Sequence, residues 1–228
     1  MIEAQDRQVI QAWNKNRTGQ QVLWLKRMNQ ETGKDFSTFC QEFSALAPSV
    51  LIAPWEEENQ SPNSSQLPGL VITDNILYSA LPLDKELRPF LEGLDRIHYG
   101  KPGPPDEIKL ALDQIPAPCR LTLYIARHCP HCPGAVNALL PLAIFSKKVH
   151  LTIIDGSLFP EAAREDRVMS APCLLMGNEF RWTGAFSPQE IIDMMIRQDP
   201  ADLSPQSLRN IIVNCHGIFY ITRIFNQI

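Results

Sequence analysis

The chain has 228 residues, of which 44% are hydrophobic and 20% are charged, and its formal net charge is −4. This composition is typical of a globular protein that forms one large domain or two small ones. The acidic balance, without a basic cluster interleaved with aromatic residues, argues against a nucleic acid partner. The sequence has no run of about 18 apolar residues, so we expect no membrane-spanning helix and no membrane partner.

The six cysteines are too few for a scaffold held together by disulfides in a chain of this length. The segment Met1–Arg7 lacks the apolar core of an export signal. These two features predict a protein of the reducing cytoplasm.

The first hundred residues read as one α/β unit, because apolar residues recur at helical spacing in some segments and form short strand-like runs in others. The expected order is a helix within 1–19, a strand over 20–28, a helix over 33–47, strands at 50–53, 68–72 and 76–78, and a helix over 84–98. Asp84 stands where an N-cap residue of the last helix is expected. Cys40 lies on the apolar face of its helix, so we expect it in the core.

A linker rich in proline and glycine at Lys101–Pro105 leads to a second unit. The expected order after it is a connecting helix over 106–115, a strand over 121–126, a helix from Cys132 with a kink at Pro141, strands at 150–154, 173–176 and 179–182, and a helix over 187–197. The order strand, helix, strand, strand, strand, helix therefore occurs twice, which indicates an internal duplication of architecture. We expect three parts: residues 1–100, residues 101–198 and a helical tail at 199–228.

Two cysteines, Cys129 and Cys132, are separated by Pro130 and His131 at the junction between an expected strand and the next helix. The N-terminus of a helix favours negative charge, so it favours a thiolate over a thiol. The thiolate is the form of cysteine that attacks disulfides. His131 lies between the two cysteines and adds positive charge when it is protonated. This spacing beside a βαβ pattern predicts a working redox dithiol.

The corresponding junction in the first unit, Asn29–Gly33, contains no cysteine, so only the second unit is expected to be redox-active. There, Cys129 is expected to attack a partner disulfide and Cys132 to resolve the mixed disulfide. Pro172 opens the strand at 173–176, and its peptide bond is a candidate for the cis form. A cis Pro172 would lie beside the dithiol and present backbone along which a substrate docks.

A structural zinc site is the alternative use of the cysteine pair, with His128 and His131 as further ligands. Such a site needs four ligands, usually from two pairs. The other candidates are Cys215-His216 and isolated cysteines, which form no second CxxC, so we favour the dithiol and expect no metal. Covalent haem attachment is excluded because Pro133 stands where that motif needs a histidine.

The element order around the dithiol is that of a thioredoxin-like unit, so the expected fold is α/β with two fused thioredoxin-like folds, each with a mixed sheet flanked by helices. Further motifs span both halves: Leu70-Val-Ile-Thr73, Pro82-Leu83-x-x-Glu86, the CxxC followed by Pro133, Ile154-Asp155-Gly156-x-x-Phe159 and Val168-Met169-x-x-Pro172. With these motifs the chain resembles the N-terminal domain of the alkyl hydroperoxide reductase flavoprotein, in which only the second of two thioredoxin folds carries the dithiol. Glutaredoxin-like protein disulfide oxidoreductases of the archaeal type are similar too, but usually have a dithiol in both halves.

The resemblance implies a relay in which electrons pass from a reduced-nicotinamide flavoenzyme through Cys129 and Cys132 to a peroxiredoxin disulfide. It implies no cofactor in this chain beyond the redox-active disulfide. Glu86 matches a glutamate that the family places near the dithiol as a proton carrier, and the alternative is an ordinary exposed helix carboxylate. The chain has no G-x-G-x-x-G, so the reductase would be a separate thioredoxin-reductase-like flavoprotein, unless the chain is a fragment.

Two other functions stay open. Pro130-His131 is the dipeptide of strongly oxidising periplasmic thiol oxidases, which would make the chain a protein disulfide oxidase or isomerase. The other function is a non-enzymatic docking module that uses the inert first unit and the apolar tail. The tail, with Leu208, Ile211 and Phe225, is expected to pack on the body or on a second copy of the chain in a homodimer.

Overall fold

The computed structural model describes residues 1–26, 31–55, 67–177 and 180–197, so the predicted tail at 199–228 lies outside the described residues. Its elements, in chain order, are α1 (Ala4–Lys15), β1 (Gln21–Lys26), α2 (Glu31–Leu46), β2 (Val50–Pro54), β3 (Gly69–Thr73), β4 (Ile76–Ser79), the 3₁₀ turn η1 (Asp84–Glu86), α3 (Leu87–Tyr99), α4 (Asp106–Asp113), β5 (Cys119–Ile125), α5 (Cys132–Phe145), β6 (Val149–Asp155), α6 (Pro160–Glu165), β7 (Cys173–Met176), β8 (Phe180–Thr183) and α7 (Pro188–Arg197). Each helix and strand predicted for the described residues is present, whereas α6 was not predicted. Within these residues, no helix has the length and hydropathy required of a membrane span.

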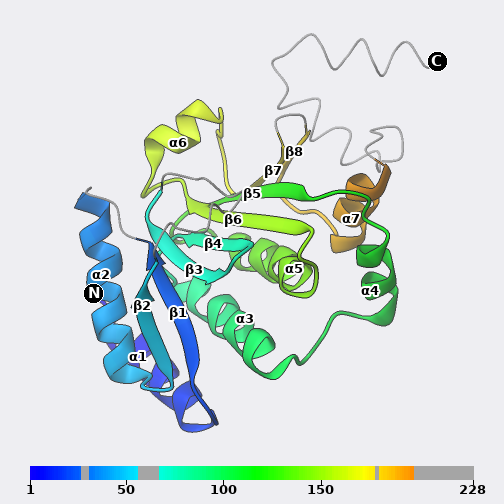
Figure 1. Cartoon of the computed structure of the whole chain (residues 1–228). Coiled ribbons are helices and arrows are strands. Elements are labelled where there is room, and N and C mark those ends of the chain that lie inside the picture. Colours follow the sequence, from blue (N-terminus) through cyan, green and yellow to red (C-terminus); the bar gives the residue numbers. More distant parts are fainter. Residues whose placement is uncertain (27–30, 56–66, 178–179, 198–228) are drawn as a thin grey trace, which may run out of the picture.

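Eight strands form one continuous mixed sheet in the order β2-β1-β3-β4-β6-β5-β7-β8 (Figure 1). The first four strands and the last four repeat one arrangement, which confirms the predicted duplication. The halves join where β4 pairs in parallel with β6, from Ile76 opposite Leu151 to Ser79 opposite Ile154. Each half thereby covers an edge strand of the other and satisfies its backbone hydrogen bonds. The two expected sheets are therefore merged into one.

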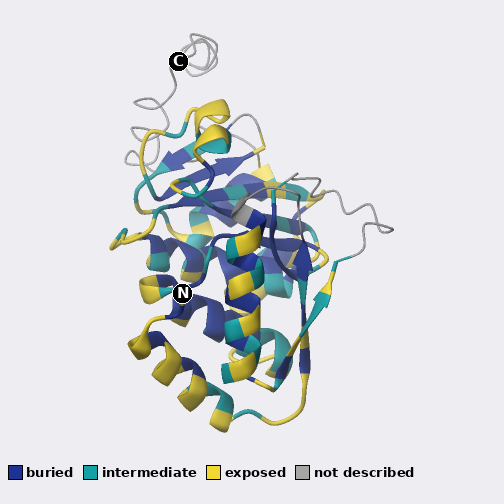
Figure 2. Cartoon of the chain, turned by 90° about the vertical axis from the view of Figure 1, so that its left-hand side faces the viewer, coloured by how far each residue is buried: buried dark blue, intermediate teal, exposed yellow. Residues whose placement is uncertain are grey.

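Packing between helices also joins the halves. Figure 1 shows α3 of the first half beside α5 of the second, against the middle of the sheet. Gly93 allows this close approach, because a Cβ at this position would lie 2.5 Å from Leu140 Cδ2. A second contact stacks Phe36 of α2 on Phe159, with ring centroids 6.4 Å apart. Figure 2 shows the result: the strands are largely buried, and exposed residues lie on the outward faces of the helices.

Asn75, in the turn between β3 and β4, is buried and links the first half to the second. Its side-chain amide donates to the carbonyl oxygens of Ala143 and Val149, each at 2.8 Å, and to that of Ser146 at 3.3 Å. Its Oδ1 accepts a hydrogen bond from Thr73 Oγ1 at 2.9 Å. The amide thus hydrogen-bonds carbonyl groups at the end of α5, where a helix has no partners of its own, and the carbonyl group of Val149 at the start of β6.

Asn75→Ala is expected to lower the free energy of unfolding by about 2–3 kcal/mol, because it leaves buried carbonyl groups without a donor. Urea denaturation followed by circular dichroism measures this change. Asn16→Ala, at an exposed position after α1, is the matched control and should change the free energy by less than about 0.5 kcal/mol. Equal losses in the two variants would contradict a linking role for Asn75.

Asp84 does not cap α3, so this prediction is wrong. Asp84 begins the 3₁₀ turn, and Glu86 occupies the N-cap position of α3 without a side-chain capping bond. The φ of Asp84 is 54°, and its backbone N–H donates to Asp6 Oδ2 at 2.9 Å. Its carboxylate faces His128 of the second half. A contact between the halves therefore replaces the local capping bond that the sequence suggested.

Candidate active site

The segment between β5 and α5 carries the two cysteines. Cys129 and Cys132 form a disulfide, with their Cα atoms 5.5 Å apart. The helix α5 begins at Cys132, and His131 occupies its N-cap position. Pro133 lies in the first turn, where its missing N–H costs no helical hydrogen bond. The CxxC thus lies at the strand-to-helix junction where the sequence predicts it.

The two cysteines differ in exposure, because Cys132 is completely buried and Cys129 is partly exposed. The backbone N–H of Cys132 donates to Cys129 Sγ at 3.1 Å. An N–H donor at the start of a helix stabilises negative charge, so the same contact favours the Cys129 thiolate once the disulfide is reduced. A partner protein can reach Cys129 directly, whereas the buried Cys132 can react only with the sulfur of Cys129.

The loop ahead of β7 lies against the dithiol. The peptide bond between Ala171 and Pro172 is cis, as expected from the sequence. The carbonyl oxygen of Ala171 lies 3.7 Å from Cys129 Sγ. Met169, three residues before Pro172, is 91% exposed. A partner that docks at Cys129 therefore meets the Met169–Pro172 segment as well.

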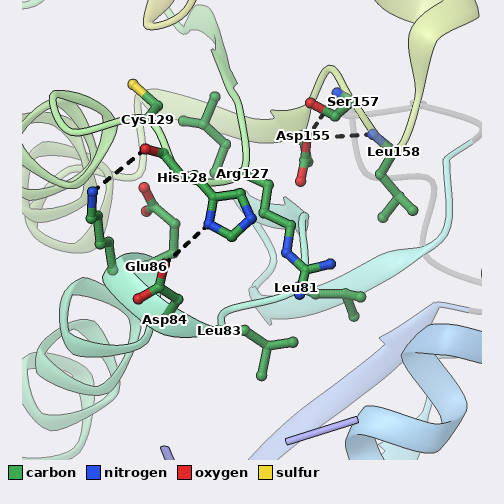
Figure 3. Close-up of a pocket in the computed structure, with 12 residues that line it drawn as sticks. Leu81, Leu83, Asp84, Glu86, Arg127, His128, Cys129, Asp155, Ser157 and Leu158 are labelled. Carbon is green, nitrogen blue, oxygen red and sulfur yellow. Dashed lines mark hydrogen bonds and ion pairs between the residues drawn. The ribbon is translucent and has the colours of Figure 1, made fainter. Parts of the chain in front are cut away.

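Glu86 belongs to the first half but lies at the dithiol of the second. Together with Cys129 it lines a cavity of about 160 Å³. Figure 3 shows its carboxylate pointing toward the segment that carries His128 and Cys129. Glu86 is only 7% exposed, so the alternative of an ordinary exposed helix carboxylate is wrong.

The environment of Glu86 favours its protonated form. Burial raises the pKa of Glu86 from the ordinary 4.5 to about 7, and the charge of Asp155 acts in the same direction. The hydroxyl of Tyr78 lies 3.5 Å from Glu86 Oε2 and acts in the opposite direction. The other oxygen, Oε1, is buried and has no hydrogen-bond partner among the described residues. Glu86 can therefore take up and release a proton near neutral pH.

The two histidines beside the dithiol have different surroundings. His131, singled out by the sequence, is exposed at the N-cap of α5. His128 has φ of 65°, and its Nδ1 lies 3.4 Å from Asp84 Oδ2, an ion pair when the imidazole is protonated. Lys85 Nζ lies 3.5 Å from the carbonyl oxygen of His128 (Figure 3). The 3₁₀ turn of the first half thus holds the loop that leads into the CxxC.

Sequence reasoning missed Asp84, Tyr78 and Asp155 as site residues. Asp155 was visible as part of the Ile154-Asp155-Gly156 motif that supported the resemblance. Nothing in the local sequence marked Tyr78, because a tyrosine inside a predicted strand reads as core. These residues come together only because β4, β6 and the turn at Asp84 converge on Glu86: Asp84 and Asp155 line the cavity with it, and Tyr78 contacts it from the core side.

The residues considered as zinc ligands in the sequence analysis do not all lie within the described residues. Cys215 and His216 lie outside the described ranges. Within those ranges, no three His, Cys, Asp or Glu side chains are grouped so that they could hold a metal ion.

Comparison with known proteins gives a family match for the second half and relatives that match about three quarters of the chain. Residues 121–196 match the thioredoxin domain family. The NADH dehydrogenase of Bacillus subtilis (strain 168) is 20% identical over 174 residues, which cover 76% of this chain and 34% of that protein. The F subunit of the alkyl hydroperoxide reductase of Staphylococcus aureus (strain N315) is 19% identical over 167 residues, which cover 73% and 32%. The chain thus spans about a third of the length of these curated relatives.

Solved structures show the same fold over most of the chain. The NTD_N/C domain of alkylhydroperoxide reductase AhpF from Enterococcus faecalis has a TM-score of 0.72 at 18% identity, covering 86% of this chain and 100% of that one. A protein disulfide oxidoreductase from Aeropyrum pernix also has a TM-score of 0.72, at 16% identity, covering 90% and 96%. These likenesses confirm the expected fold and the resemblance to the N-terminal domain of the reductase. The chain therefore has a thioredoxin-like fold, and its second half carries a CxxC whose two cysteines form a disulfide.

Proposed function

We propose that this chain carries electrons by dithiol exchange from a separate flavin-dependent reductase to a protein disulfide such as that of a peroxiredoxin. One arrangement carries the proposal: a partly exposed Cys129 forms a disulfide with the buried Cys132 and lines one cavity with the buried acid Glu86. The curated relatives named as the F subunit of alkyl hydroperoxide reductase support the choice of partners. We place the carrier in the cytoplasm, where a reductase can keep the dithiol reduced.

In the first step, the Cys129 thiolate attacks one sulfur of the partner disulfide. A bond forms between Cys129 Sγ and that sulfur, the partner S–S bond breaks, and the second partner sulfur leaves with the electron pair as a thiolate. The N–H of Cys132, 3.1 Å from Cys129 Sγ in the disulfide state, supports the attacking thiolate. The Met169–Pro172 segment offers backbone to the docked partner.

In the second step, Cys132 gives its proton to the Glu86 carboxylate and attacks Cys129 Sγ. The internal disulfide forms, the bond to the partner breaks, and the released partner thiolate takes up a proton from Glu86. Two electrons have then moved from the carrier to the partner. The thiolate that the first step released takes its proton from solvent, so the partner leaves as a dithiol. The Cys129–Cys132 disulfide of the structure is the oxidised product, and the flavoprotein returns it to the dithiol with two electrons and two protons.

Reconstitution tests this proposal. The full chain is mixed with a thioredoxin-reductase-type flavoprotein, reduced nicotinamide and a peroxiredoxin, and nicotinamide oxidation is followed after peroxide is added. We expect peroxide-dependent oxidation only when the chain is present. Oxidation at the same rate without the chain, or none with it, would refute the carrier role.

A protein disulfide oxidase or isomerase is the second candidate, and Pro130-His131 is the observation that favours it. The midpoint potential, measured by equilibration with glutathione and alkylation of free thiols, separates the two. We expect a value near that of thioredoxin, about −270 mV, whereas the periplasmic oxidant lies near about −120 mV. A value close to the second figure would reverse the proposed direction of electron flow.

A further inference from the structure

Glu86 is bordered by a phenol on its core side and by a second carboxylate across the cavity. Tyr78, on β4, is completely buried and places its hydroxyl 3.5 Å from Glu86 Oε2. Oε1 of the same carboxylate is buried, and no group in the described part of the chain forms a hydrogen bond with it. Asp155, at the end of β6, lines the same cavity as Glu86 and Cys129. One oxygen of the acid is thus held, and the other is left for proton transfer.

The position of Tyr78 is set by the sheet and by α3. Tyr78 lies opposite Ile153 in the β4–β6 ladder that joins the halves. Its ring packs edge-on against Phe90, with centroids 5.4 Å apart. Burial raises the pKa of Tyr78 well above its ordinary value, so the group remains a hydroxyl donor at physiological pH. A fixed neutral donor of this kind favours the ionised form of the carboxylate that accepts from it.

Asp155 is held by its own turn. One carboxylate oxygen accepts hydrogen bonds from the backbone N–H groups of Ser157 at 2.8 Å and Leu158 at 3.3 Å (Figure 3). The charge of Asp155 disfavours a second negative charge at Glu86 and raises the pKa of that group. The other charged or titratable groups that line the cavity come from the turn and from the dithiol loop: Asp84, Lys85, Arg127, His128 and Cys129.

We propose that Tyr78 and Asp155 are positioning residues of the resolving step, which act on Glu86 in opposite directions. Tyr78 holds Oε2 from the core, so that Oε1 serves the proton transfer in the cavity, and Asp155 keeps Glu86 from remaining ionised. The inference rests on the proposed role of Glu86 as the base for Cys132. It adds that the fused sheet supplies both groups that set the proton affinity of Glu86, because Tyr78 lies on β4 and Asp155 at the end of β6.

The proposal predicts opposite shifts in the pH dependence of resolution. Glu86 accepts the Cys132 proton only when it is ionised, so the rate of the second step rises with pH through the pKa of Glu86. Tyr78→Phe removes the donor, so the rising limb should move to higher pH. Asp155→Asn removes the repelling charge and keeps an oxygen for the turn, so the limb should move to lower pH. Below the midpoint, moving the limb by about half a pH unit changes the rate about threefold.

Stopped-flow reaction of the reduced full chain with 5,5′-dithiobis(2-nitrobenzoic acid) separates the two steps. Attack by Cys129 releases the first thionitrobenzoate, and attack by Cys132 on the mixed disulfide releases the second. Cys132→Ser should show only the first phase, which identifies the second. Tyr99→Phe and Asp113→Asn, outside the cavity, are matched controls and should leave the second phase unchanged.

The role of Glu86 and the roles of Tyr78 and Asp155 are tested by different outcomes. If Glu86→Gln keeps the rising limb of the second phase, the proposed role of Glu86 is wrong. If Glu86→Gln removes the limb, but Tyr78→Phe and Asp155→Asn do not shift it in opposite directions, the positioning inference is wrong. Carbon-13 NMR titration of the Glu86 carboxyl in the oxidised chain measures directly whether each substitution raises or lowers the pH at which Glu86 ionises, without any reaction. Should one variant fail to fold, the direction of shift in the other decides.

Discussion

Cys129→Ser is expected to reduce dithiol exchange with a partner disulfide by more than about 1,000-fold, because no other sulfur in the described part of the chain can take over the first attack. Cys132 is completely buried, and Cys40 and Cys173 are buried in the core. Cys119 is half-buried, and burial raises the pKa of its thiol to about 11, which keeps it in the thiol form. The loss is measured as the rate of insulin or peroxiredoxin disulfide reduction in the presence of dithiothreitol.

Cys132→Ser should instead trap the partner, because attack by Cys129 still occurs and nothing resolves the mixed disulfide. The adduct is isolated under non-reducing conditions and identified by its mass. Cys119→Ser is the matched control and should leave both the rate and the adduct-free state unchanged. If Cys129→Ser kept full activity in the cell, the docking-module alternative would replace the carrier, since that function needs no sulfur.

Glu86→Gln should slow the resolving step by about 100-fold or more, because a neutral amide cannot accept the proton of the buried Cys132. The first attack should keep its rate, since Cys129 is stabilised by the N–H of Cys132 rather than by Glu86. The two phases of thionitrobenzoate release measure both effects in one experiment. A loss confined to the first phase would contradict this division of roles.

Glu86→Gln is expected to slow the reaction but to raise the free energy of unfolding above neutral pH. Folding raises the pKa of Glu86 from 4.5 to about 7, so the folded state binds the proton more tightly than the unfolded state. The stabilisation that this provides is fully present below pH 4.5 and is lost as pH rises to about 7. Above that range the buried charge costs about 3 kcal/mol, which glutamine avoids. Urea denaturation at pH 8 should therefore find Glu86→Gln more stable than the parent chain, with little difference at pH 4.5.

The dithiol and the repeated architecture were predictable because their causes are local. Cys129 and Cys132 are three positions apart at a junction where a strand-like run meets a helical pattern, and α5 does begin there. The cis bond at Pro172 was predictable for the same reason, because only before a proline does the cis form have a low free-energy cost. Asp84 shows the limit of local reasoning, because its sequence context suggests a cap and its contact with His128 decided otherwise.

Sequence periodicity determined by itself which segments are strands and helices, with the exception of α6, and the spacing of two cysteines determined which half carries the CxxC. The tertiary structure alone decided that β4 joins β6. It also places Glu86 of the first half at the dithiol of the second, a position that only the family resemblance had implied. Tyr78, Glu86 and Asp155 come from three separate elements: Glu86 and Asp155 line one cavity, and Tyr78 contacts Glu86 from the core side. The physical reason is that side-chain patterns report burial along a single element, whereas the proton affinity of a buried acid depends on charges and donors that only long-range packing brings within reach.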